Sequence, residues 1–467
     1  MSYLQKLYFP ALNRLFSLTG KIDEKWRMLI TEVCFGVLSL MTVVYCSADP
    51  SLVRSVFSLF LLAVITVMSV REPLKEIKIP KLPDILWTLF SLCMLVAAID
   101  PNAGDPDFAV SAIMIPFVLP ALYLVWAGRG DFDTLFGMLC RPLALVYTLY
   151  CIALFFIAPY NDPEYMWTHR YLGTATHPNY LGLLMLAGIV SCVYLVLTSK
   201  KTAVKIVSAA GAVLMTMFMT LSNSRTALVS VAAVVFAAFL YSLLRKEKIA
   251  AISSVVLLAA IFLTFFFSYK YTVYSAKMFD AAELAKQNAA VSAAVSASEA
   301  NSASADAAAS AAPAAAAPAA ELIINGRMSG GTLDSILSDR PNVWRSYIKH
   351  VGFRGHALTG NERIDLTGTL SRAHNQYLDN AFSMGIINAV SELIFDLTAL
   401  GYAAVWMFKK DGFKGYKLFM TLSAAAFFLS CLCEYVGSPV NKGLTLLYFI
   451  AVVPMFAPTG KSEKTAN

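Results

Sequence analysis

Long apolar segments separated by short polar ones run along almost the whole chain, with one interruption between positions 269 and 373. A bilayer has a hydrocarbon core about 30 Å thick, which a helix of about 20 apolar residues can cross. We therefore predict an all-α polytopic membrane protein with about twelve transmembrane helices. The segments lie near residues 28–46, 51–70, 82–99, 108–127, 141–158, 180–198, 203–221, 226–244, 249–268, 384–408, 416–436 and 443–458.

The amino-acid composition supports a membrane protein. Hydrophobic residues make up 58% of the 467 positions and charged residues 14%, whereas an ordinary soluble domain has about 25% charged residues. A soluble globular protein is excluded because this much apolar surface cannot all be hidden from water. A disordered chain is excluded because disorder needs low hydrophobicity and high charge.

The positions of the basic residues predict the orientation of the helices. Of the 37 Lys and Arg residues, 23 lie in the two tails and in alternate short loops, and only four lie in the short loops between them. Cytoplasmic loops carry an excess of Lys and Arg, while long loops cross the membrane largely regardless of charge. We therefore expect both termini in the cytoplasm and the long loop outside. The net charge of +7 then reflects topology, and no nucleic-acid partner is expected.

The chain divides into four regions. Residues 1–268 hold the first nine predicted helices, and residues 384–467 hold the last three. Between them, 281–320 contains 22 Ala and six Ser in 40 positions, so we interpret 269–320 as a linker, part helix and part disordered. A tolerated insertion and an O-glycan acceptor remain as two explanations of this tract. Residues 321–383 form a polar, patterned outer loop that contains two candidate catalytic residues, Arg340 and His374.

A predicted amphipathic helix in this loop places an arginine at its N-terminus. Asp339, Arg340 and Pro341 precede an apolar stripe, and Pro341 suits the first helical position. The free N–H groups at a helix N-terminus together with a guanidinium make a phosphate site. Alternatively, Arg340 pairs with Asp339 or caps a local group. The stripe consists of Val343, Trp344, Tyr347, Ile348 and Val351.

A histidine lies at the predicted outer surface where the chain enters the tenth helix. Gly352, Gly355 and Gly360 form a predicted loop, and residues 371–378 then lead into the membrane. A histidine with its ordinary pKa near 6.5 can act as a base or an acid, so His374 is a candidate for either role. A structural hydrogen bond is the alternative. No HxH or HExxH pattern occurs, and so no metal site is expected.

Two short outer loops carry further cations. Arg225 lies among small polar residues in Ser222–Thr226, and Arg170 opens the segment that leads to Asn179. Snorkelling to the membrane surface is one explanation of such residues. If they converge instead, they would hold the phosphates of an anionic lipid beside a base. The candidates for this convergence are Arg170, Arg225, Arg340, Arg372 and His374.

Three acidic residues lie inside predicted helices, where charge is costly and commonly functional. Glu392 and Asp396 are four positions apart and share one helix face, and Glu434 lies near the outer end of the eleventh helix. Each is expected to serve as the counter-ion of an outer-face arginine or as a proton-pathway residue. We favour the orientation of an arginine.

The order of three short motifs resembles a known family. SRTA follows the seventh predicted helix, DRPNVW lies in the long loop and RAHNQYL precedes the tenth helix. In a protein with twelve predicted helices, this arrangement resembles the O-antigen ligase/polymerase superfamily, and most nearly the lipopolysaccharide O-antigen ligases. The resemblance covers roughly residues 165–450. The Ala/Ser tract and the first spans have no counterpart in its motifs.

The resemblance implies a metal-independent glycosyltransferase without a cofactor, facing the periplasm from the bacterial inner membrane. The donor would be a glycan on undecaprenyl diphosphate and the acceptor a sugar of the lipid A core. Arg225 and Arg340 match the arginines that hold the donor diphosphate, and His374 matches the essential histidine. Glu434 lies where the ligases carry Asp. The residues expected to bind substrate are Arg170, Arg372, Asn375 and Glu434.

Three other functions remain open at this stage. An O-antigen polymerase and a protein O-oligosaccharyltransferase belong to the same superfamily, and the motifs do not reveal which acceptor is used. A multi-pass transporter would show an inverted repeat and broken helices in corresponding halves. Pro116 and Pro120 interrupt the fourth predicted helix, but no matching pair occurs in the second half. Transport is therefore disfavoured.

Overall fold

The fold is built from helices packed side by side, as a computed structural model shows. The structure describes residues 1–47, 52–98, 106–160, 162–167, 170–300, 340–356, 360–368, 372–409, 411–437 and 442–458. In these residues, ten helices are long and apolar enough to cross a membrane. Two shorter apolar helices, Leu52–Met68 and Gly443–Phe456, occupy the second and twelfth predicted segments. The prediction of an all-α polytopic membrane protein is thus confirmed.

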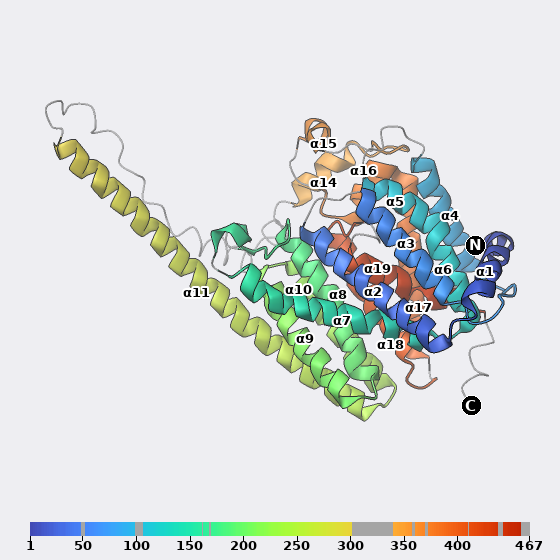
Figure 1. The fold of residues 1–467 in the computed structure, drawn as a ribbon. Coiled ribbons are helices and arrows are strands. Elements are labelled where there is room, and N and C mark those ends of the chain that lie inside the picture. The colour runs from blue at the N-terminus through green and yellow to red at the C-terminus, as the bar shows by residue number, and fades with distance from the viewer. Residues whose placement is uncertain are drawn as a thin grey trace.

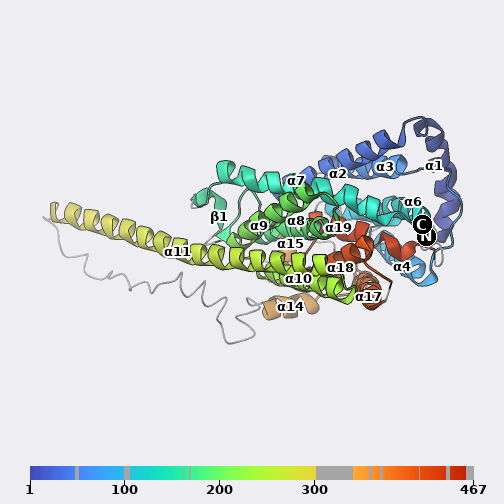
Figure 2. The same cartoon turned by 90° about the horizontal axis from the view of Figure 1, so that it is seen from below.

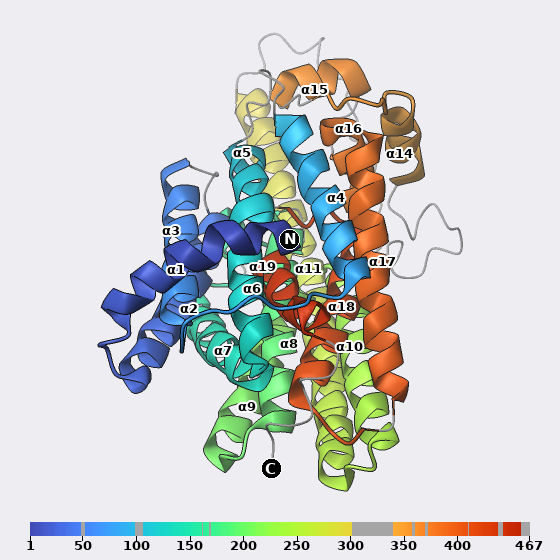
Figure 3. The same ribbon diagram turned by 90° about the vertical axis from the view of Figure 1, so that its right-hand side faces the viewer.

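The first half of the chain contains helices near each of the first seven predicted segments. It also contains an N-terminal helix that lies across the bundle (Figure 3). The elements are η1 (Ser2–Leu4), α1 (Gln5–Thr19), α2 (Glu24–Ser47), α3 (Leu52–Met68), α4 (Lys81–Ala98), α5 (Pro106–Ile113), η2 (Met114–Val118), α6 (Leu119–Arg129), α7 (Phe132–Ile157), η3 (Pro163–Tyr165), β1 (Met166–Trp167), β2 (Arg170–Tyr171), α8 (Pro178–Thr198) and α9 (Thr202–Leu221). Strands β1 and β2 form a small antiparallel pair. The predicted break of the fourth segment is a π-helical turn, η2, which contains Pro116. Proline has no backbone N–H to donate, so the regular α-helical hydrogen bonding is interrupted there.

The second half contains the remaining membrane helices and the short helices of the outer loop. Its elements are α10 (Arg225–Leu244), α11 (Lys248–Ala300), α14 (Arg340–Ile348), α15 (Gly360–Thr367), α16 (Gln376–Met384), α17 (Ile386–Phe408), α18 (Gly415–Cys433), α19 (Gly443–Ala451) and η4 (Val453–Phe456). Helix α8 lies at the centre and packs against α7, α9, α10 and α18. Almost all of its residues are buried, which explains its uniformly apolar sequence.

Helix α11 is longer than the sequence predicts. The apolar part, Lys248–Tyr274, packs along α9 and α10, and the helix then continues to Ala300 beyond the bundle (Figures 1 and 2). The alanine-rich sequence continues the helix because alanine has the highest helix propensity. The predicted linker is therefore helical up to Ala300, and residues 301–339 lie outside the described part of the chain.

Helices α14, α15 and α16 group together at one end of the bundle (Figures 1 and 3), which we call the α14–α16 end. Three details differ from the prediction. Helix α14 ends at Ile348 rather than near Val351, and Gly360 begins α15 instead of belonging to a loop. The predicted tenth helix begins at Ile386, near the expected residue 384, but the residues before it form a separate helix, α16, and the two helices meet at Gly385. This junction requires a glycine, since Gly385 has φ +91° and a Cβ there would lie 2.2 Å from the carbonyl oxygen of Phe353.

Candidate functional site

The carboxylate of Glu434 is the centre of a buried polar cluster at the α14–α16 end. Glu434 follows the last residue of α18 in extended conformation, and its side chain is 6% exposed. Its Oε1 accepts hydrogen bonds from Asn179 Nδ2 at 2.7 Å and Arg340 Nη2 at 2.5 Å, while Oε2 lies 2.9 Å from His374 Nδ1. A buried carboxylate is tolerable only when partners of this kind compensate for its lost hydration.

These partners keep Glu434 ionised. Burial alone would raise the pKa of Glu434, but the hydrogen bond from His374 and the positive charge of Arg340 outweigh burial and hold the pKa below its usual range. The charged form therefore dominates at neutral pH. Glu434 is thus the counter-ion of an arginine at this end of the bundle, as predicted.

A small apolar cluster fixes Arg340 relative to His374. Arg340 is the first residue of α14, and its side chain is 14% exposed. The ring of Tyr347 on the same helix packs on Phe382 of α16 with 5.0 Å between centroids. Trp344 Nε1 donates to the carbonyl of Ala373, the residue before His374, at 2.7 Å. The predicted position of Arg340 at a helix N-terminus is confirmed, and Asp339 lies outside the described residues.

The backbone of His374 adopts a conformation that is uncommon for a histidine. Its φ is +49°, a left-handed value that costs free energy outside glycine and often marks functional positions. Asn375 follows as the cap of α16, with Oδ1 accepting from Leu378 N at 2.9 Å and Nδ2 donating to Leu432 O at 3.0 Å. These bonds aim the imidazole at Glu434. A proton on Nδ1 then leaves Nε2 with a lone pair.

Arg170 reaches the same cluster through an asparagine that the sequence analysis did not select. Arg170 Nη2 donates to Asn179 Oδ1 at 2.5 Å, and its Nε donates to Ser222 O at 2.9 Å. Asn179 also donates to Glu434, so it connects the two charged side chains. His177 caps α8 by accepting from Asn179 N at 3.1 Å. Burial, and then the charge of Arg170, lower the pKa of His177 to about 4, which leaves the ring neutral at neutral pH.

Arg225 lies beside this cluster at the first turn of α10. The guanidinium groups of both Arg225 and Arg340 act electrostatically on the thiol of Cys433, the neighbour of Glu434. A tight turn holds Arg225 in this position, with Asn223 at φ +49°. The turn packs closely on α8, where Gly182 has no side chain to keep Ser224 away.

Substituting Gly182 with alanine is expected to displace the turn that carries Arg225 and to lower the unfolding temperature. The added Cβ would lie 2.5 Å from Ser224 Cβ and 2.8 Å from its Oγ, and overpacking of this kind costs about 1–3 kcal/mol. Thermal unfolding in detergent measures the effect. The double variant with Ser224→Gly removes both clashing atoms and should recover most of the loss. Gly401→Ala is the matched control, because the space beside Gly401 is open. An unchanged unfolding temperature for Gly182→Ala would contradict the tight contact.

Arg372 lies next to the cluster but faces other groups. Its guanidinium lies 4.3 Å from the ring centroid of Tyr435 and 3.7 Å from Asp379. At 39% exposed, its side chain is more accessible than those of Arg340 and Glu434. The structure thus brings Arg170, Arg340 and His374 together on Glu434, with Asn179 between Arg170 and Glu434, and it places Arg372 at the rim.

The two acidic residues within α17 do not have the partners that the sequence analysis favoured. Glu392 accepts hydrogen bonds from Gln376 Nε2 at 3.3 Å and from the Asn380 amide. Asp396 accepts from Tyr448 at 2.6 Å and Tyr377 at 2.9 Å. The expectation that they balance an outer-face arginine is wrong, because neutral donors from α16 and α19 reach them first.

Gln376 is a further residue that the sequence analysis missed. Besides its bond to Glu392, its Oε1 accepts from the backbone N–H of Val436 at 3.0 Å and of Gly437 at 3.3 Å. One amide therefore joins α16 and α17 to the segment that follows Glu434. No distinctive pattern of charge or spacing marked this role in the sequence.

In the described residues, His374 and Glu434 thus form a histidine–carboxylate pair at one end of a membrane bundle. The three arginines around it are Arg170, Arg225 and Arg340. Such a pair can accept a proton from a hydroxyl, and the arginines can neutralise a phosphate group. Comparisons with protein-family models, with curated proteins and with solved structures found no match.

Proposed function

We propose that this protein is an O-antigen ligase, which transfers a glycan from undecaprenyl diphosphate to the lipid A-core acceptor on the periplasmic face of the bacterial inner membrane. The observation that carries this proposal is the shared carboxylate: Glu434 contacts both His374 and Arg340. A proton acceptor and a phosphate-binding cation are thereby held side by side. The order of motifs in the sequence supports the same family.

The proposed reaction uses each group in a defined role. Nε2 of His374 takes the proton of the acceptor hydroxyl while that oxygen bonds to the anomeric carbon of the donor sugar. The bond between this carbon and the diphosphate oxygen breaks, and its electron pair leaves with the diphosphate. Arg340 and Arg225 stabilise the charge that develops on this leaving group, in a site where removing one such donor typically costs about 2.7–4 kcal/mol.

The distribution of basic residues supports an outward-facing site. The loops at the opposite end of the bundle hold most of the Lys and Arg residues that lie between helices, and such loops are cytoplasmic in the positive-inside pattern. The α14–α16 end would then face the periplasm. A polyprenyl diphosphate in the membrane could reach Arg340 from this side without crossing the bilayer.

Complementation of a bacterial strain that lacks its own ligase tests the proposal. We expect the wild-type protein to restore laddered lipopolysaccharide on a gel, and we expect Arg225→Ala, Arg340→Ala and His374→Ala to abolish the ladder at equal protein levels in the membrane fraction. Arg345→Ala is the matched control, because Arg345 is exposed on the same helix as Arg340 and contacts Asn342. Glycosylated periplasmic proteins or single-repeat caps would redirect the assignment to a sister enzyme. A full ladder with His374→Ala would remove His374 from the reaction.

A further inference from the structure

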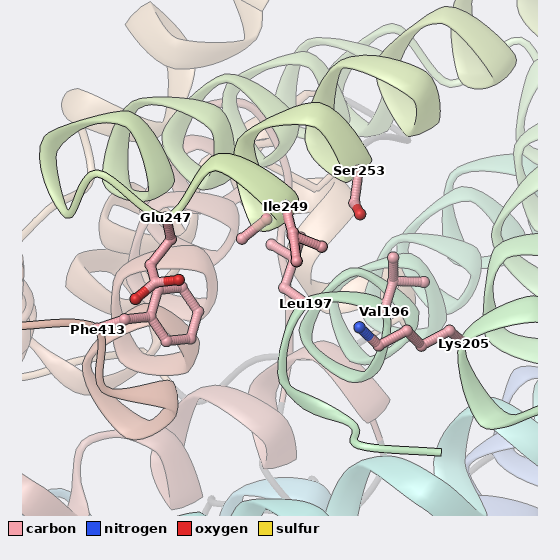
Figure 4. A pocket seen from close by; sticks show the side chains of 8 residues that line it. Val196, Leu197, Lys205, Glu247, Ile249, Ser253 and Phe413 are labelled. Atoms are coloured by element: carbon pink, nitrogen blue, oxygen red, sulfur yellow. The ribbon is translucent and has the colours of Figure 1, made fainter. Parts of the chain in front are cut away.

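A cavity of about 190 Å³ lies at the end of the bundle opposite the α14–α16 end. Helix α8 connects the two places, since Asn179 is in its first turn and Val196 and Leu197 are in its last. The remaining walls come from the first turn of α9, the start of α11 and the segment before α18, which contributes Phe413 (Figure 4). A drug-sized ligand needs about 300 Å³ or more, so this cavity suits a smaller polar group.

Three polar side chains line the cavity: Lys205, Glu247 and Ser253. Figure 4 shows the Glu247 carboxylate at one side and the Lys205 ammonium at the other, with Leu197 and Ile249 between them. In the part of the chain that the structure describes, neither charged group lies within 4.0 Å of an opposite charge. In contrast, the nearby Arg245 forms an ion pair with Asp411 at 3.2 Å.

The hydroxyl of Ser253 also lacks a protein partner among the described residues. A serine hydroxyl within a helix commonly bonds to the carbonyl four residues earlier, as Ser254 does with Ala250 at 2.8 Å. Ser253 makes no such bond among the described residues, and its hydroxyl points into the cavity (Figure 4). The cavity therefore presents a cation, an anion and a hydroxyl, all without protein partners in the described structure.

We propose that this cavity binds the headgroup of an ethanolamine phospholipid. The phosphate would contact Lys205, and the primary ammonium, with its three N–H donors, would contact Glu247 and Ser253. The exposed apolar side chains of Ile206 and Ile252, on the helices beside the cavity, suit the acyl chains. This site is independent of the proposed glycan transfer.

Glu247 distinguishes this lipid from an anionic one. Lysines at positions 200, 201, 246 and 248 lie within five residues of Lys205 or Glu247 in the sequence, and a basic surface by itself attracts lipids with a net negative charge. A carboxylate among them opposes a headgroup that carries only negative charge and favours one with an ammonium. The proposal therefore predicts selectivity between two lipids of similar size.

Native mass spectrometry of the delipidated full-length protein, incubated with equal amounts of phosphatidylethanolamine and phosphatidylglycerol, tests this selectivity. We expect the wild type to retain phosphatidylethanolamine with a roughly three- to tenfold preference. Glu247→Gln should bring the preference close to one, and Lys205→Ala should lower retention of both lipids.

Two further variants keep the test decisive. Ser253→Ala removes one contact to the ammonium without changing the charge, so it should reduce the preference. It takes the place of Glu247→Gln in the test if that variant folds poorly. Lys200→Ala removes a lysine outside the cavity and should behave as the wild type. Equal retention of the two lipids by the wild type would overturn the proposal, as would an unchanged preference in both Glu247→Gln and Ser253→Ala.

Discussion

Replacing Glu434 with glutamine is expected to lower glycan transfer by about 100-fold or more. In the wild type, one carboxylate oxygen faces the donors of Asn179 and Arg340, and the other faces the ring of His374. A glutamine offers a single acceptor oxygen and places an NH₂ group against one of these donors. Either the imidazole or the guanidinium then loses its partner, and both lose the negative charge that orients them.

Transfer of glycan in isolated membranes measures this effect at matched protein levels. Glu434→Asp keeps the charge on a side chain shorter by one methylene, so it should retain more activity than Glu434→Gln. Glu32→Gln is the control, because Glu32 forms a more exposed pair with Arg141 at 2.7 Å and lies far along the sequence from the site. Near-wild-type transfer by Glu434→Gln would contradict the central role of this carboxylate.

The same substitution should change how stability depends on pH. The pKa of Glu434 lies below its ordinary value of 4.5 in the folded protein, so the unfolded chain takes up the proton first as the pH falls. The stabilisation is therefore complete above about pH 4.5 and is lost as the pH drops through the folded-state pKa. Glu434→Gln lacks this contribution, and its unfolding temperature should fall less than that of the wild type in this acidic range.

The helices could be predicted well from the sequence. An apolar segment inside a bilayer must pair its own backbone N–H and C=O groups, and an α-helix does so within the segment. The charged residues that meet at the site could also be identified from the sequence, since the short outer loops carry only four cations, and Arg340, Arg372 and His374 lie in short motifs of the long loop. The extension of α11 to Ala300 and the break at Gly385 were harder to foresee. The first depends on helix propensity without an apolar face, and the second on a backbone contact with Phe353.

The neutral partners in the site could not be predicted from the sequence. Asn179 and Gln376 lie near charged residues of the site in the sequence, but an amide carries no charge, and its role depends on which groups the fold brings near it. Glu392 and Asp396 show the same limit from the acceptor side. Their shared helix face was correct, yet their donors come from α16 and α19, and the Tyr448 hydroxyl that reaches Asp396 is 52 residues away in the chain.

Gln376 is expected to act as a positioning residue, and Gln376→Leu should lower glycan transfer by about 10- to 100-fold. Its amide holds the segment that contains Val436 and Gly437 against α16. His374 lies two residues before Gln376, and Glu434 lies two residues before Val436. Loss of the amide should let the imidazole and the carboxylate separate, and a misplacement of about 1 Å can cost 100-fold in rate.

The reactivity of His374 toward diethyl pyrocarbonate distinguishes this role from a general loss of stability. The imidazole is 27% exposed and bonded to Glu434, so Gln376→Leu should make its modification several times faster, as read by peptide mass spectrometry, while His350 and His356 change little. Thr398→Ala serves as the control, because Thr398 is a half-buried residue whose side-chain hydrogen bond among the described residues goes to Ile394 of its own helix. This readout does not depend on the proposed reaction. If His374 becomes more reactive but no glycan transfer is found even in the wild type, the positioning role stands and the proposed function fails. If His374 reacts at its wild-type rate in Gln376→Leu, then Gln376 does not hold the pair together.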